Sequence, residues 1–428
     1  MNAAASTSPY LDALETREPA ERERALMAAL PALVAHARAA STAFAEILRD
    51  VDPAALTSRA ALAKLPVTRK HELLQRQQAA RAAGGDPFGG FSTVGWRGLV
   101  RGSGAARVFQ SPGPIYEPEG GARDYWRMAR ALYAAGIRGG DLVHNSFSYH
   151  LTPAGSMMES GALALGCTVF PGGVGNTELQ LQAIADLKPR AYIGTPSFLR
   201  ILLEKAAESG ADVGSLERAS LGGEAFPPSL RDWLAERGVQ GYQSYGTADL
   251  GLVAYETEAR EGLVLDEGVI VEIVRPGTGD PVADGEVGEL VVTTLNRDYP
   301  LVRFGTGDLS AVMPGHCPTG RTNTRIRGWM GRADQTTKVR GMFVHPGQVA
   351  EIVRRHAEVK RARLVVSGEM ADDRMTLRVE VDGRPEGLAQ RLAESVRDVT
   401  KLRSEVELVA PGSLPNDGKV IEDARSYR

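Results

Sequence analysis

Short apolar runs alternate with longer amphipathic stretches along the chain from about residue 98 to residue 220. The runs have the length of buried strands, and they are 142–144, 168–170 and 191–193. The stretches repeat apolar residues at helical spacing, and they are 125–135, 157–165, 178–187 and 197–207. Strands joined by crossover helices predict an α/β fold, in which ligands gather at the carboxyl ends of the strands.

The pattern changes on both sides of this region. Before it, 21–48 is rich in Ala, Leu, Arg and Glu and is typical of one or two helices. After it, 263–274 and 288–294 alternate in the manner of antiparallel strands. A β-rich subdomain is therefore expected from about residue 262.

The last part of the chain has an element order of its own. A strand that contains Gly341 comes first, and the elements predicted after it are a helix at 346–356, strands at 362–367 and 376–381, a helix at 387–400 and a strand at 406–409. This order is typical of a compact α+β domain. We expect an N-terminal domain of residues 1–332 and a C-terminal domain of residues 333–428.

Composition narrows the class of partner. The net charge is -3 and the pI about 6.2, so no basic excess points to nucleic acid or to an anionic membrane, and neither is expected as a partner. Two cysteines, Cys167 and Cys317, exclude a disulfide framework and a four-cysteine zinc site built from this chain alone. Residues 1–14 lack the pattern of a secretory signal, and no apolar run spans a bilayer, so the sequence predicts a cytoplasmic protein.

The first candidate motif is a pair of glycines. Gly222 and Gly223, with Glu224 after them, stand at the end of a predicted strand and lead into a new helix. Two glycines at such a position let a flat ring approach the backbone closely, as an adenine would. A plain turn is the competing interpretation.

A second loop combines three groups that suit a nucleotide. Tyr245 supplies an aromatic face, Thr247 a hydroxyl and Asp249 a carboxylate, with Gly246 among them. These groups fit a purine, a phosphate oxygen and a Mg²⁺ ion.

Three further residues extend this ordered set. Asp308 lies between β-type segments, where a carboxylate can accept hydrogen bonds from both hydroxyls of a ribose, although a turn aspartate is the alternative. Arg332 falls at the inferred domain boundary and suits a bidentate phosphate contact, with a surface salt bridge as the alternative. Lys419, close to the chain end, is a candidate reactive cation carried by the C-terminal domain.

In this order the motifs resemble those of the adenylate-forming ligases and, within them, the phenylacetate-coenzyme A ligase branch. The resemblance runs over nearly the whole chain, up to Lys419. The segments that carry it besides the motifs above are 64–70, 134–141, 144–145, 165–169, 188–189 and 195–197.

The resemblance implies a large multi-subdomain N-terminal domain, a small mobile C-terminal domain and two half-reactions. A carboxylate attacks the α-phosphate of ATP to give an acyl adenylate and pyrophosphate. The C-terminal domain then rotates, and the thiolate of coenzyme A takes the acyl group. Lys419 would stabilise the charge that develops during adenylation.

The resemblance also implies roles for the remaining motifs. Asp249 would serve Mg²⁺, Asp308 the ribose and Arg332 the nucleotide. Arg340 and Gly341 would face the pantetheine tunnel after rotation about a hinge near 334–335. The residues that would line or adjoin the adenine site are Gly222, Gly223, Glu224, Tyr245, Gly246 and Thr247.

The acyl site is expected within 145–150, where the branch places its aromatic-acid pocket. Phe147, Tyr149 and His150 are the candidates for substrate binding. A core position for Phe147 and a structural role for His150 are the alternatives.

The chain departs from the branch in its phosphate-binding loop. The branch carries Ser-Ser-Gly-Thr-Thr-Gly-Lys-Pro, whereas residues 101–109 here lack both threonines and the lysine. Ser103 and Gly104 remain as candidate phosphate ligands, Arg107 is a substitute cation, and backbone N–H groups are expected to contribute. ATP binding is expected to be weakened.

Two further departures concern metals. Asp249 stands where the branch usually has glutamate, which shortens the reach of the carboxylate toward Mg²⁺. Some relatives hold zinc through a Cys-Pro-Cys element, whereas this chain has Cys317-Pro318-Thr319, and no zinc is expected.

The sequence therefore predicts an AMP-forming ligase that joins an aromatic or similar small carboxylic acid to coenzyme A, with ATP and Mg²⁺. One variant of this hypothesis passes the acyl group to another acceptor. The alternative class is a catalytically degenerate binding or regulatory protein on a ligase scaffold. The sequence leaves open which acid is used and whether the chain forms a homodimer.

Overall fold

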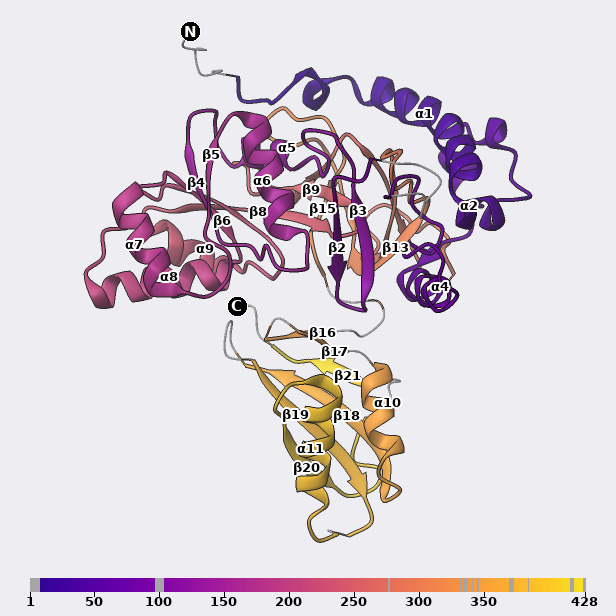
Figure 1. Cartoon of the computed structure of the whole chain (residues 1–428), viewed down its shortest axis with the longest axis vertical. Helices are drawn as coiled ribbons and strands as arrows, with labels where there is room; N and C mark the ends of the chain where they lie inside the picture. Colours follow the sequence, from indigo (N-terminus) through magenta and orange to yellow (C-terminus); the bar gives the residue numbers. More distant parts are fainter. Residues whose placement is uncertain are drawn as a thin grey trace. The chain divides into compact units, whose positions relative to one another are not determined.

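A computed structural model describes residues 8–96, 104–275, 278–330, 333, 337–340, 342–344, 346–368, 373–383, 385–415 and 419–425. The chain divides into two compact units, Met1–Gly331 and Arg332–Arg428 (Figure 1). None of the helices in the described ranges is long and apolar enough to cross a membrane.

The large unit begins with helices, as predicted for 21–48. Its N-terminal elements are η1 (Ala13–Thr16), α1 (Pro19–Ala40), α2 (Thr42–Ile47), η2 (Pro53–Ala55), α3 (Arg59–Leu62) and α4 (Lys70–Ala82). Ser41 separates α1 from α2, because its Oγ accepts a hydrogen bond from the Phe44 amide at 3.2 Å and so caps the second helix. Leu30, Val34 and Phe44 are fully buried in one hydrophobic core with strands of the β-rich part.

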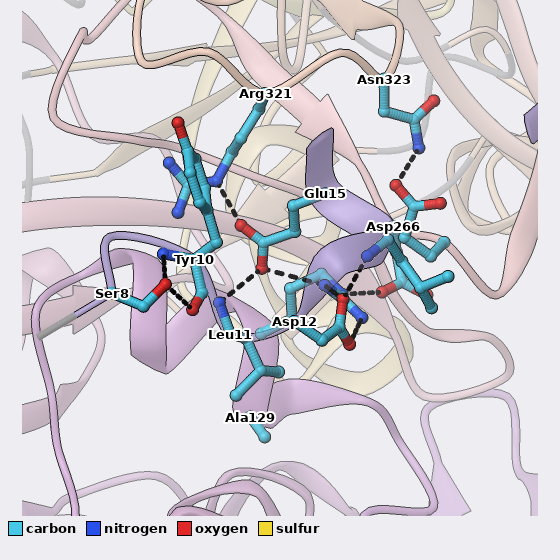
Figure 2. Close-up of polar contacts among 12 residues, drawn as sticks. Ser8, Tyr10, Leu11, Asp12, Glu15, Ala129, Asp266, Arg321 and Asn323 are labelled. Carbon is cyan, nitrogen blue, oxygen red and sulfur yellow. Dashed lines mark hydrogen bonds and ion pairs between the residues drawn. The ribbon is translucent and has the colours of Figure 1, made fainter. Parts of the chain in front are cut away.

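A buried ion-pair network fastens the segment before α1 to the rest of the large unit (Figure 2). Glu15 is 1% exposed, and its carboxylate accepts hydrogen bonds from Arg321 Nε at 2.6 Å and Arg130 Nη1 at 2.9 Å. The backbone amide of Leu11 donates to the same carboxylate at 3.2 Å. A carboxylate this deeply buried is tolerated because two guanidinium groups and an amide satisfy it.

A large mixed sheet with the strand order β14-β15-β10-β9-β8-β7-β6-β4-β5 forms the centre of the large unit. Its parallel part consists of β4 (Leu142–Asn145), β5 (Thr168–Pro171), β6 (Ala191–Gly194), β7 (Arg218–Leu221) and β8 (Gln240–Thr247). The helices that alternate with these strands are α5 (Met128–Ala134), α6 (Ala154–Leu165), α7 (Thr177–Leu187), α8 (Pro196–Ser209) and α9 (Pro228–Ala235). The predicted α/β alternation is confirmed, and Leu221, the last residue of β7, pairs with Gln243 of β8.

The β-rich part that follows contributes to two sheets. The strands that extend the large sheet are β9 (Gly251–Tyr255), β10 (Leu263–Leu265), β14 (Val312–Met313) and β15 (Arg325–Ile326). A second sheet of order β1-β13-β12-β11 contains β1 (Thr68–Arg69), β11 (Val269–Val274), β12 (Gly288–Thr294) and β13 (Phe304–Ser310). The segment 263–274, which the sequence pattern presents as one alternating stretch, is therefore divided between two sheets. A separate hairpin joins β2 (Arg107–Ser111) to β3 (Ile115–Glu119).

The small unit has the α+β order that the sequence predicts, except that two short antiparallel strands stand where one strand was expected. Its elements are β16 (Thr337–Val339), β17 (Met342–Val344), α10 (Pro346–Arg354), β18 (Val359–Ser367), β19 (Arg374–Val381), α11 (Leu388–Thr400), β20 (Glu405–Val409) and β21 (Ile421–Asp423). The sheet order is β20-β19-β18-β21, with both edge strands parallel to their neighbours. Leu388, Leu392 and Val396 of α11 are fully buried in the core of this unit. The short edge strand β21, which comes two residues after Lys419, was not predicted.

Candidate functional site

Several predicted nucleotide residues lie at the carboxyl end of β7 and in the second half of β8. Gly222 follows β7, and a Cβ at this position would lie 3.2 Å from the Ser244 carbonyl oxygen of β8. Gly223 has a left-handed φ of 78°, which a side chain would strain, and a Cβ there would lie 3.5 Å from the Phe147 ring. Gly223 is exposed and Gly222 is buried, so the accessible backbone beside the Phe147 ring is that of Gly223.

The Glu224 side chain accepts hydrogen bonds from the first turn of α8. Its Oε1 accepts hydrogen bonds from the amide of Ser197, at 2.8 Å, and from the Ser197 hydroxyl. Ser197 lies in the first turn of α8, whose N-cap is Thr195. In this arrangement Glu224 satisfies a helix N-terminus and holds the Gly222–Gly223 turn against α8.

The side chains of Tyr245 and Asp308 meet, although they are far apart in sequence. The Tyr245 hydroxyl donates to Asp308 Oδ2 at 2.8 Å, and Trp329 Nε1 donates to Asp308 Oδ1 at 3.1 Å. A carboxylate oxygen has two acceptor positions, so each oxygen of Asp308 can take part in more than one hydrogen bond. Trp329 is a partner of Asp308 that sequence reasoning did not identify.

Asp249 is buried and forms an ion pair with Lys70. Its side chain is 1% exposed, and its Oδ2 lies 2.8 Å from Lys70 Nζ. The other oxygen, Oδ1, is buried and has no hydrogen-bond partner within the described residues. Sequence reasoning missed Lys70 as a partner, although it ends the 64–70 segment that matches the family.

Glu117 on β3 is a second buried carboxyl group near Asp249. It is fully buried, and it accepts hydrogen bonds from the hydroxyl and the amide of Ser111. Burial, together with the negative charge of Asp249, raises the pKa of Glu117 to about 8. Glu117 is therefore mostly protonated at neutral pH. Asp249 is the carboxylate that forms the ion pair with Lys70.

Arg127 anchors the loop that carries Asp249. Its Nη2 donates to the carbonyl oxygens of Leu250 at 2.7 Å and Leu252 at 2.9 Å, and its Nε donates to Asp266 Oδ2 at 2.7 Å. Arg127 itself adopts a left-handed φ of 63° as the N-cap of α5. This conformation explains why the helix predicted for 125–135 begins only at Met128.

Several groups of the loop that were expected to bind phosphate make hydrogen bonds within the protein. Arg107 Nη1 donates to Glu119 Oε1 at 3.1 Å across the β2–β3 hairpin. The amides of Ala105 and Ala106 donate to the carbonyls of Gly95 at 3.2 Å and Glu119 at 2.7 Å. These two N–H groups are therefore engaged within the protein. Gly104 has a left-handed φ of 105°, whereas Ser103 lies outside the described residues.

The three acyl-site candidates differ in their contacts and in their exposure. Phe147 borders Gly223, whereas the Tyr149 hydroxyl accepts from Asn145 Nδ2 at 2.8 Å and donates to Glu159 Oε2 at 2.7 Å. Burial and the neighbouring Glu159 raise the pKa of Tyr149, which stays a neutral donor. His150 is exposed, and its amide donates to Ser148 Oγ at 3.1 Å.

In the small unit, Arg340 lies in the β16–β17 turn and Lys419 is exposed just before β21. Arg332 and Gly341 lie outside the described residues, as does the hinge at 334–335. Cys317, in the large unit, is buried with its sulfur 3.3 Å from Thr257 Oγ1 and 3.1 Å from Thr319 Oγ1.

Comparisons with known proteins match both units. The family model of the AMP-binding enzymes matches residues 123–296, and the model of the AMP-binding enzyme C-terminal domain matches residues 341–424. The chain is 32% identical to phenylacetate-coenzyme A ligase of Thermus thermophilus, over 95% of this chain and 96% of that protein. It is 31% identical to phenylacetate-coenzyme A ligase of Escherichia coli, over 69% and 72%.

A solved structure also matches the whole chain. The crystal structure of 2-hydroxyisobutyryl-CoA ligase with 2-HIB-AMP and CoA has a TM-score of 0.82 and 26% identity, and the match covers 100% of this chain and 95% of that one.

Proposed function

This chain belongs to the adenylate-forming AMP-binding enzymes, in the phenylacetate-coenzyme A ligase branch, and we propose that it joins a small carboxylic acid to coenzyme A through an acyl adenylate. The observation that carries this proposal is the match over nearly the full length of both this chain and a phenylacetate-coenzyme A ligase. In the first step a carboxylate oxygen bonds to the α-phosphorus of ATP and pyrophosphate leaves. In the second step the coenzyme A thiolate bonds to the acyl carbon and AMP leaves.

The base and the ribose of the nucleotide are assigned to the large unit. Gly222 and Gly223 have no side chains that would keep a flat base from the backbone, and Gly223 is exposed beside Phe147. Asp308, held by Tyr245 and Trp329, is assigned to the ribose hydroxyls. Arg332 is assigned to the phosphates and Lys419 to the charge that develops during adenylation.

Asp249 fits a magnesium ligand. Its buried Oδ1 has no partner within the described residues, and a carboxylate oxygen is a donor that Mg²⁺ prefers. When bound, Mg²⁺ offsets negative charge on the triphosphate. Arg127 holds the loop that carries this carboxylate, and Lys70 pairs with the carboxylate.

The acid is proposed to be aromatic or similarly small, with its ring or alkyl group beside Phe147. The Tyr149 hydroxyl faces Asn145 and Glu159, so that part of the segment is polar. His150 is assigned no contact with the acid, because it is exposed.

A second candidate function is favoured by one observation. Arg107 and the amides of Ala105 and Ala106 are engaged within the protein, so the loop offers fewer free donors to the triphosphate. A binding or regulatory protein would keep AMP or coenzyme A binding without turnover. Carboxylate-dependent exchange of pyrophosphate into ATP separates the two functions, because only an adenylating enzyme supports it.

A further inference from the structure

A carboxylate without a cationic partner among the described residues adjoins the acyl-site candidates. It belongs to Glu159, which lies in the middle of α6 and is half-buried. Its Oε2 accepts a hydrogen bond from the Tyr149 hydroxyl at 2.7 Å. No residue in the described ranges donates to its Oε1 or forms an ion pair with it. A half-buried carboxylate oxygen that lacks a protein donor is a position where a ligand can donate a hydrogen bond.

Hydrogen bonds tie Glu159 to the segment that is expected to hold the acid. Asn145, the last residue of β4, donates from Nδ2 to the Tyr149 hydroxyl at 2.8 Å. The Oδ1 of the same side chain accepts from the Phe147 amide at 3.2 Å. Phe147 and Glu159 are therefore held by one chain of hydrogen bonds. This chain lies at the carboxyl end of a parallel strand, where α/β proteins bind ligands.

The β2–β3 hairpin brings a second carboxylate and a cation close to Glu159. The Gln110 amide donates to the Leu151 carbonyl at 2.8 Å, so β2 lies against the acyl-site segment. Burial and the negative charge of Glu159 raise the pKa of Glu119, and the Arg107 guanidinium opposes this shift. Arg107 Nη1 lies 3.1 Å from Glu119 Oε1, so this cation is matched to Glu119. Within the described residues the surplus charge at this place is therefore negative.

The charge of Glu159 determines which end of an acid it can meet. Glu159 repels the carboxylate of the acid, which has to reach the α-phosphate of ATP, so that carboxylate is directed away from Glu159. The opposite end of the acid then lies toward Oε1. A methyl group at that end would remove the oxygen from water without a donor, which costs free energy. An amino group supplies N–H donors and, when protonated, a compensating positive charge.

We propose that Glu159 selects acids that carry an amino group at the end remote from the carboxylate, with the amino nitrogen donating to Glu159 Oε1. This assignment rests on the proposed ligase function and narrows its aromatic or similarly small acid to an amino-substituted one. Tyr149 is a positioning residue, because its hydroxyl holds Oε2 and leaves Oε1 to the substrate. An amino group is favoured over a hydroxyl group, because it can carry the positive charge that complements the surplus negative charge.

The test uses acyl sulfamoyl adenosines, which are stable mimics of acyl adenylates and bind without turnover. Calorimetric titration of the full-length protein compares an amino with a methyl and a hydroxyl substituent at each ring position of a benzoyl group. The best amino mimic is expected to bind more tightly than its methyl counterpart by about tenfold or more, as a hydrogen bond to a charged group provides.

Variants of Glu159 assign this preference to its carboxylate. Glu159→Gln, which keeps an acceptor oxygen and loses the charge, is expected to reduce the preference to about threefold or less. Glu159→Leu is expected to abolish it. Glu204→Gln, which removes the charge of an exposed glutamate paired with Arg200, is the matched control and is expected to leave the preference unchanged.

Several outcomes would overturn this assignment. Equal affinity for the amino and methyl mimics in the wild-type protein would remove the amino group from the site. A preference that persists in Glu159→Gln and Glu159→Leu would place the amino group elsewhere. An equal loss of affinity for both mimics in Glu159→Gln would show a structural role. Tighter binding of a hydroxyl mimic than of every amino mimic would assign Glu159 to another class of acid.

Pyrophosphate exchange with the same acids, measured in parallel, separates this assignment from the ligase function. Acid-dependent exchange without an amino preference would contradict the role of Glu159 and leave the ligase function intact. An absence of exchange, together with an amino preference that Glu159→Gln removes in the titration, would contradict the ligase function and leave the role of Glu159 in binding intact.

Discussion

Lys70 Nζ lies 2.8 Å from Asp249 Oδ2, across 179 residues of sequence. Lys70 is the first residue of α4 and comes directly after β1, which pairs in parallel with β13. Asp249 lies in the turn between β8 and β9. The ion pair therefore joins the N-terminal helices to the loop that carries the candidate metal ligand.

Removal of Lys70 is expected to destabilise the protein through Asp249. Lys70→Met leaves a carboxylate with a 1% exposed side chain unpaired, while Lys70 itself is 37% exposed, so a loss of about 1–3 kcal/mol is expected. Urea unfolding measures it. Lys205→Met, which breaks an exposed pair with Glu208, is the control and is expected to cost less than about 0.5 kcal/mol. If Asp249→Asn does not rescue part of the Lys70→Met loss, the pair is not the cause.

Glu117 is expected to make stability depend on pH. Its pKa is about 8 in the folded protein, whereas the unfolded chain ionises near 4.5, so the unfolded state binds fewer protons between these values. Stability should therefore fall as pH rises from about 5 to 8, by on the order of a few kcal/mol. Urea unfolding at pH 5, 6.5 and 8 with a chelator measures this fall.

Glu117→Gln keeps an acceptor for Ser111 and removes the titrating group. The variant is expected to show a flatter stability profile over the same pH range. An equally steep profile in the variant would assign the effect to other groups.

Arg127 is expected to act on Asp249 through the backbone. Arg127→Gln removes the donors to the Leu250 and Leu252 carbonyls, so the metal carboxylate loses its fixed position. The Mg²⁺ concentration for half-maximal ATP–pyrophosphate exchange should rise several-fold. Arg237→Gln, which removes an exposed arginine beside Trp233, serves as the comparison. A purely structural role would lower stability without moving the magnesium requirement.

Lys419 is expected to act in the first half-reaction. Lys419→Ala should slow adenylate formation by about 100-fold or more, a size typical of the loss of one electrostatic contact to a transition state. Thioester formation from preformed acyl adenylate should be largely kept. Single-turnover measurements of the two steps separate them, with Lys401→Ala, an exposed lysine at the C-cap of α11, as the control. Equal loss in both steps would remove Lys419 from its assigned role.

The regular elements could be predicted from the sequence, because apolar periodicity reflects which face of a strand or helix is buried. The strands at 142–144, 168–170 and 191–193 lie within one residue of their observed ends. Pairing between distant segments leaves no such local pattern. The contacts of Lys70 with Asp249 and of Trp329 with Asp308 depend on tertiary packing, and β21 has too few residues for a period to appear.

The candidate site could likewise be predicted only in part: the residue types follow from the sequence, but their contacts do not. The motifs identified Tyr245, Asp249 and Asp308 as residue types suited to a nucleotide, but they could not show that Tyr245 donates to Asp308. Nor could they show that the amides of Ala105 and Ala106 are taken by Gly95 and Glu119. Hydrogen-bond partners of this kind are decided by the fold.

The exchange of labelled pyrophosphate into ATP, measured with a panel of aromatic and small aliphatic acids, tests the proposed activity most directly. The expected result is exchange that requires both Mg²⁺ and at least one acid of the panel and that Lys419→Ala abolishes. An absence of acid-dependent exchange across the panel, from folded protein that still binds AMP, would contradict the ligase function and favour a binding role.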